Sequence, residues 1–206
     1  MKYRLIFPLV ALVASSFAIA EEADTRDPVT IIEETTSLLL TTLEERRDEY
    51  TENPALLREM INNDLLPLID TEYSARLILG PAGRGVEPQQ LAEFADAMSS
   101  VLLTRYADGL VNFRSGEQFE VLPLKGKNTE KMTRVRTRLK LEKGGFVPID
   151  YAFRKTPAGW KAFDVTVEGI SYVITFRNQI SPQVKQNGIE KVTEGIRTGN
   201  IKLEKE

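Results

Sequence analysis

The chain has 206 residues, of which 28% are charged, a formal net charge of −3, and neither histidine nor cysteine. The lack of these two residue types excludes disulfides, a cysteine nucleophile, a histidine-based catalytic triad and an imidazole metal site, and nothing suggests a cofactor. The acidic balance also argues against binding to nucleic acid and against electrostatic attachment to anionic lipid.

The first twenty residues have the pattern of a secretory signal peptide. Lys2 and Arg4 precede an apolar run over 5–13, and an Ala-Ile-Ala sequence ends at Ala20. The apolar run is too short to span a bilayer, so we expect export with cleavage after Ala20. Residues 21–206 would then form a single domain. Loss of the two basic residues leaves 25 bases against 30 acids, a net charge of −5.

Start and stop signals for helices follow residue 20. Asp27-Pro28 and Asn53-Pro54 each place an N-cap residue before a first-turn proline, so a helix is expected to begin at each. Pro67 should end or kink the second of these helices. A short helix is expected from about Thr71 to Leu79, and Gly80-Pro81 should stop it.

The longest helix is expected to begin near Pro88. Its apolar residues recur every three or four positions, which is typical of a helix with one buried stripe. These residues are Leu91, Phe94, Met98, Val101, Leu102, Tyr106, Leu110 and Phe113. Such a stripe is more often part of a solid core than the wall of a cavity.

From Ser115 the apolar period changes to two, which predicts β-strands. The alternating residues are Phe119 and Val121; Thr133, Val135, Thr137, Leu139 and Leu141; Val147, Ile149, Tyr151 and Phe153; and Phe163, Val165 and Val167. Short turns between them predict an antiparallel meander with one face covered by helices and one face in water. The tail from Tyr172 to about Arg197 should be helical, with interruptions near Pro182 and Gly188. The fold class is therefore α+β.

The order of several short motifs resembles that of the MlaC family, also called the toluene-tolerance Ttg2 family. The resemblance covers roughly residues 28–200. Its motifs are Leu66-Pro67-x-x-Asp70, Leu79-Gly80, Pro88-x-Gln90-x-x-x-Phe94, Tyr106, Pro148-Ile149-x-Tyr151, Gly159-Trp160-Lys161, Asp164-Val165-x-Val167-Glu168-Gly169-Ile170-Ser171 and Arg177.

The resemblance implies a soluble, monomeric, periplasmic phospholipid carrier without enzymatic activity. In this family an antiparallel sheet is partly wrapped by helices, and an apolar cavity between them holds the acyl chains while the phosphate headgroup stays near the surface. The implied partners are a diacyl glycerophospholipid, an inner-membrane ABC lipid transporter complex and an outer-membrane complex of a lipoprotein with a porin. Its role would be to preserve the lipid asymmetry of the outer membrane.

A cavity for acyl chains needs an aliphatic and aromatic lining with few polar atoms. The apolar strand face and the long helix opposite it have that composition, and tyrosines suit a wet mouth. The expected lipid-binding residues are Leu102, Tyr106, Val135, Leu139, Val147, Ile149, Tyr151, Phe163, Val165 and Val167. The same residues would also suit a solid core between sheet and helices.

A row of basic residues lies on the polar side of the second strand. The row consists of Arg134, Arg136, Arg138 and Lys140. It is either a solvated face paired with acids of neighbouring strands or a surface that docks acidic regions of partner proteins. A phosphate contact is a third interpretation. Elsewhere, Trp160 is expected to be a packing anchor. Asp164 and Arg177 are candidates for an ion pair between strand and helix.

Two other functions compete with a carrier. A pocket enzyme could use carboxylates and tyrosine for acid–base chemistry, but the strand acids Glu120, Asp150 and Asp164 fall on the polar side of their strands. A lipid-free adaptor of the cell envelope would instead rely on the basic row. No residue is assigned a catalytic role.

Overall fold

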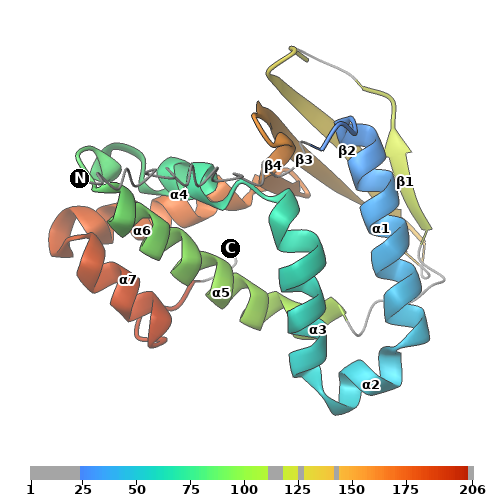
Figure 1. The fold of residues 1–206 in the computed structure, drawn as a ribbon, viewed down its shortest axis with the longest axis horizontal. Coiled ribbons are helices and arrows are strands. Elements are labelled where there is room, and N and C mark those ends of the chain that lie inside the picture. Colours follow the sequence, from blue (N-terminus) through green and yellow to red (C-terminus); the bar gives the residue numbers. More distant parts are fainter. Residues whose placement is uncertain (1–23, 111–117, 125–127, 142–143, 204–206) are drawn as a thin grey trace, which may run out of the picture.

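The computed structural model describes residues 24–110, 118–124, 128–141 and 144–203, except for the side chains of 105–109. The expected signal peptide and Phe113 lie outside these ranges. Figure 1 shows a sheet on one side of the molecule, a group of helices on the other, and a helical arm that runs beside the sheet and returns toward those helices. The expected α+β class is confirmed.

The arm contains α1 (Pro28–Glu45), α2 (Arg47–Glu52), α3 (Pro54–Met60), the π-helical turn η1 (Ile61–Leu65) and the 3-10 turn η2 (Leu66–Leu68). Both expected start signals are confirmed. The Asp27 carboxylate accepts hydrogen bonds from the backbone N–H groups of Val29 and Thr30, and the Asn53 side chain accepts one from Ala55. Pro67 lies in η2, which ends the arm as expected. The short helix α2 and the π-helical turn were not predicted.

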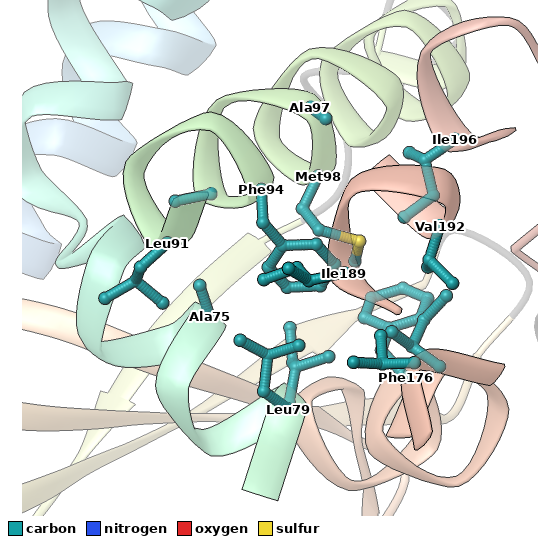
Figure 2. Close-up of a cluster of buried hydrophobic side chains, with 14 of the residues drawn as sticks. Ala75, Leu79, Leu91, Phe94, Ala97, Met98, Phe176, Ile189, Val192 and Ile196 are labelled. Atoms are coloured by element: carbon teal, nitrogen blue, oxygen red, sulfur yellow. The ribbon is translucent and has the colours of Figure 1, made fainter. Parts of the chain in front are cut away.

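The second group of helices contains α4 (Thr71–Leu79), α5 (Pro88–Leu110), α6 (Tyr172–Asn187) and α7 (Ile189–Arg197), with the 3-10 turn η3 (Gly80–Gly83) between the first two. Figure 2 shows their shared core, in which Phe94 and Met98 of α5 lie with Phe176 of α6 and Val192 of α7. None of the helices within the described ranges is long and apolar enough to cross a membrane.

The expected interruption of the C-terminal helix at Pro182 is wrong, because α6 runs through it without a break. Pro182 cannot donate a backbone hydrogen bond, but Ile180 and Val184 on either side of it are buried and hold the helix in place. The expected break at Gly188 is confirmed. Gly188 has a φ of +83°, which glycine adopts readily, and it separates α6 from α7.

The sheet is an antiparallel meander in the order β1-β2-β3-β4-β5, as predicted. Its strands are β1 (Gln118–Leu122), β2 (Met132–Lys140), β3 (Phe146–Thr156), β4 (Gly159–Val167) and β5 (Ile170–Ser171). The register places Val135, Tyr151 and Val165 side by side, and Thr137, Ile149 and Val167 beside them. These rows form the face toward α1, which packs against β1 and β2.

The alternation expected for β4 is broken by a bulge. Phe153 pairs with Ala162 and Ala152 pairs with Asp164, so Phe163 has no partner across the strand pair. Two hydrogen bonds from the start of α4 fix this irregular backbone, since Asp70 N–H donates to the Ala162 carbonyl and the Ser74 hydroxyl donates to the Phe163 carbonyl.

The junction of β5 with α6 is held by a carboxylate. Asp164 accepts a hydrogen bond from the Ser171 hydroxyl at 2.6 Å and another from the backbone N–H of Val173 at 3.0 Å, while Ser171 itself caps the helix. The expected ion pair of Asp164 with Arg177 is therefore not formed. The Arg177 guanidinium instead donates to the Leu77 carbonyl. Trp160 packs in the cluster between α1 and the sheet, as expected for an anchor.

We predict that Asp164→Ala lowers the free energy of unfolding by about 1–2 kcal/mol, because it leaves the backbone N–H of Val173 and the half-buried Ser171 hydroxyl without an acceptor. Urea unfolding followed by circular dichroism measures this change. Asp150→Ala is the matched control: this carboxylate lies on the same strand face but makes only a 3.7 Å surface ion pair with Arg134, so its loss should cost less than about 1 kcal/mol. Equal losses for the two variants would contradict the capping role.

Candidate functional site

The buried apolar side chains of the described residues form three separate clusters instead of one continuous core. The first lies among α4, α5, α6 and α7. The second joins Ile31 and Ile32 of α1 to Val135, Phe153 and Ala162 of the sheet. The third holds the arm together and reaches the end of α5. The apolar face of the sheet lies partly outside all three clusters.

Along this face the side chains become less covered from β2 toward β4. Val135 and Thr137 of β2 are fully buried, and Leu139 is nearly so. The side chains that continue the face on β3 and β4 are only half-buried, although all are apolar or aromatic. They are Val147, Ile149, Tyr151, Val165 and Val167, and we call them the open apolar face.

The difference in cover comes from α1. This helix packs against β1 and β2 and does not reach over β3 and β4 to the same extent. The buried Thr137 hydroxyl donates to the Ile149 carbonyl, so this polar group has a partner. Half-buried apolar side chains on the inner face of a sheet are a surface that an apolar ligand can cover.

The chemistry of the open apolar face is almost wholly apolar. Its side chains include no carboxylate or cation, and its one polar atom is the Tyr151 hydroxyl. Crowding by apolar neighbours desolvates this hydroxyl, which raises the pKa of Tyr151 to about 12. Within the described residues no group of three or more acidic side chains is placed to hold a metal ion.

The strand acids that an acid–base enzyme would need are engaged elsewhere. Asp150 pairs with Arg134, and Glu120 pairs with Arg138 at 2.6 Å, both on the other face of the sheet. Asp164 caps α6. The geometry therefore provides an apolar binding surface and offers no carboxylate to a ligand that lies on it.

The other predicted lipid-binding residues lie in different surroundings. Val135 belongs to the cluster beneath α1, and Leu139 of the same strand is also buried. Leu102 packs against the cluster of α4 to α7, and the Phe163 ring lies edge-on to Tyr73 with centroids 5.1 Å apart. The side chain of Tyr106 lies outside the described residues.

The basic row of β2 lies on the opposite face of the sheet from the open apolar face. Arg138 stacks over the Phe146 ring at 4.5 Å in addition to its pair with Glu120, and the Arg136 guanidinium donates to the Pro123 carbonyl at 2.9 Å. The expectation of cross-strand acids is thus confirmed for two of the arginines. Arg134 and Lys140 are exposed, with 53% of the Arg134 side chain accessible, whereas Arg136 and Arg138 are half-buried.

Sequence reasoning missed one part of the apolar face. Ile170 pairs with Val167 across the turn Glu168-Gly169, so it extends the face onto β5. The signal was present, because two apolar residues that flank a two-residue turn ending in glycine are typical of a hairpin. The strand is only two residues long, and the helix signal at Ser171 concealed it.

This is an α+β protein in which the apolar sheet face is buried on β2 and only half-buried on β3 and β4. The chain belongs to the MlaC family, which matches residues 33–198 under the description MlaC protein.

Two relatives cover most of the chain. It is 24% identical over 187 residues to the intermembrane phospholipid transport system binding protein MlaC of Haemophilus influenzae, covering 88% of this chain and 85% of the relative. It is 24% identical over 192 residues to the toluene tolerance protein ttg2D of Pseudomonas putida, covering 92% and 83%.

A solved structure has the same fold. The phospholipid-binding protein from Ralstonia solanacearum, determined in complex with a phospholipid, superposes with a TM-score of 0.76 at 21% sequence identity. The match covers 85% of this chain and 99% of that chain.

We predict that the folded protein loses stability as the pH rises from about 10 to about 12, because the unfolded chain releases the Tyr151 proton at the ordinary pKa of tyrosine while the folded protein holds it up to a pKa of about 12. The loss should be on the order of 1 kcal/mol per pH unit. Urea unfolding at pH 9 and pH 11 measures it, with Tyr151→Phe as the control that lacks the group. The same pH dependence in both proteins would show that Tyr151 is not desolvated.

Proposed function

We propose that this protein is a periplasmic carrier that binds a phospholipid with its acyl chains against the open apolar face. The observation that carries the proposal is the run of half-buried apolar side chains on β3 and β4, most of which belong to none of the three packed clusters. Membership of the MlaC family supports it, as do the phospholipid transport named for the Haemophilus relative and the phospholipid bound by the Ralstonia protein.

The energetics of lipid transfer explain why such a face is needed. Two acyl chains carry about 30 methylene groups, and their exposure to water at about 0.8 kcal/mol each would cost more than about 20 kcal/mol. Free passage through an aqueous compartment is therefore negligible. A carrier has to replace the bilayer interior with an apolar surface, and it must do so without buried polar groups that need partners.

The remaining parts of the proposal concern location and partners. The signal-peptide pattern of residues 1–20 supports export to the periplasm. There the protein would exchange lipid with an inner-membrane ABC transporter complex and an outer-membrane lipoprotein–porin complex, and so preserve outer-membrane lipid asymmetry. Its acidic balance favours release from anionic membranes after exchange.

Arg134, Arg136 and Arg138 would dock the acidic regions of these partner complexes. Their position supports this role, because they project from the face of the sheet opposite the open apolar face. A partner bound there would leave the lipid-binding face accessible. Together with Lys140 they outnumber the acids Asp150 and Glu120 that neutralise part of the row.

We predict that Ile149→Glu reduces co-purifying phospholipid by at least about tenfold, because a carboxylate pressed against acyl chains costs more than the ~1.4 kcal/mol that a tenfold change in affinity requires. Native mass spectrometry followed by lipid extraction measures the content. Asp150→Ala, the next residue and on the opposite face, is the control and should retain its lipid.

Two results would contradict the carrier. One is normal lipid content in a folded Ile149→Glu variant. The other is wild-type protein that carries no lipid after purification and takes none from vesicles, which would favour a lipid-free adaptor.

We predict that a triple variant weakens binding of both membrane complexes by at least about tenfold and leaves the lipid content unchanged. The variant combines Arg134→Glu, Arg136→Glu and Arg138→Glu, so that negative charges face the acidic partners. The control reverses Lys185, Lys191 and Arg197, three exposed cations on α6 and α7, and so changes the net charge equally. Pull-down with each complex measures binding. If both triple variants weaken binding equally, the change in net charge explains the loss of binding, and the docking surface on β2 is refuted.

A further inference from the structure

The open apolar face does not end at β4. Ile170 of β5 lies directly opposite Val167, which in turn pairs with Ile149, so the three side chains share one face of the sheet. Val135 and Thr137 at the β2 side of this face are fully buried, Ile149 and Val167 are half-buried, and Ile170 is 47% exposed. The face is therefore closed by α1 on one side and reaches solvent at β5.

A second exposed isoleucine follows Ile170 closely in the chain. Ile174 is four residues further along, in the first turn of α6, and is 56% exposed. The two residues are fixed relative to each other, because Asp164 and Ser171 hold the end of β5 to the start of α6. We call Ile170 and Ile174 the apolar lip.

Local preferences do not explain these residues. Ile174 is the third residue of its helix, where Glu or Gln would complete a capping box with Ser171. Ile170 precedes the cap, but the fourth helical position, which supplies its apolar partner in a hydrophobic staple, is occupied by Thr175. Each exposed isoleucine forgoes part of the stabilisation that full burial would give.

The turn that leads into the lip is also unfavourable. Glu168 and Gly169 form the two-residue connection between β4 and β5, with φ of +51° and +86°. Both central residues of such a turn need positive φ, which glycine and asparagine adopt readily and glutamate does not. Departures from local preference that gather at one place are expected at functional sites.

We propose that the apolar lip is the passage through which acyl chains move between a membrane and the open apolar face. This inference rests on the proposed carrier function and adds where the lipid crosses. Acyl chains are the expected ligand of the lip because Ile170 is the solvent-exposed end of the same apolar face. An acyl chain that moves along this face past Val167 contacts Ile170 next. Acyl chains that cross there remain in contact with apolar side chains instead of water, which lowers the barrier to exchange.

The natural chain contains no cysteine, so one introduced cysteine is a unique attachment point. Ile170→Cys and Ile174→Cys are each labelled with a bulky hydrophilic maleimide, and uptake of a fluorescent phospholipid from phosphatidylcholine vesicles is followed in time. Phe146→Cys is the matched control, because Phe146 is 52% exposed but lies on the opposite face of the sheet, paired with Lys140. Circular dichroism checks the fold, and unlabelled variants are run in parallel.

The label at position 174 should slow uptake by about tenfold or more relative to the same unlabelled variant while the lipid content at equilibrium stays unchanged, because Ile174 lies on α6 and not on the sheet. The label at position 170 should slow uptake at least as much. The label at position 146 should leave the rate within about twofold. If neither label changes the uptake rate relative to the unlabelled variant, the proposed passage is overturned and the proposed carrier function stands. Wild-type protein that takes up no lipid at all overturns both proposals.

Discussion

Apolar side chains that the protein itself does not fully cover are the constraint around which this structure is built. Full burial of a residue such as Val or Ile is worth roughly 1.5–3 kcal/mol, so leaving several of them half-covered on β3 and β4 gives up a substantial part of the stability that a filled core would provide. Three separately packed clusters compensate for that loss elsewhere. The protein therefore folds while the side chains of its open apolar face stay only half-buried.

That face has to be held rigidly if it is to stay open. Asp70 is central to this, because it caps α4, donates its backbone N–H to β4 at Ala162, and pairs with Arg154 of β3 at 2.5 Å. The Arg154 guanidinium also lies 4.3 Å from the centroid of the Tyr73 ring. Two residues further along β4 from Ala162, Asp164 joins the sheet to α6. These hydrogen bonds and the ion pair of Asp70 fix α4 and α6 to β3 and β4.

Much of the fold could be predicted because its signals are local. The cap-and-proline pairs at Asp27 and Asn53 set two helix starts, and the bounds of α4 agree with the expected Thr71 to Leu79. The period-two alternation gave the meander and its inward face. The bulge at Phe163 could not be predicted in the same way, because hydrogen bonds from Asp70 and Ser74, distant in sequence, select it.

The candidate site could be predicted only in part, for a related reason. Val135 and Ile149 have the same alternating pattern, yet one is fully buried and the other is half-buried. What separates them is how far α1 extends over the sheet, and this depends on the packing of the whole arm. Alternation assigns a residue to a face, whereas its cover is a tertiary property.

The central claim is that acyl chains occupy the open apolar face, and a crystal structure of the protein loaded with a phospholipid tests it most directly. We expect acyl carbons within about 4.5 Å of Ile149, Tyr151 and Val165, the distance that defines an apolar contact. A structure in which these three side chains are covered by the protein's own residues, with the lipid bound elsewhere or absent, would contradict the account.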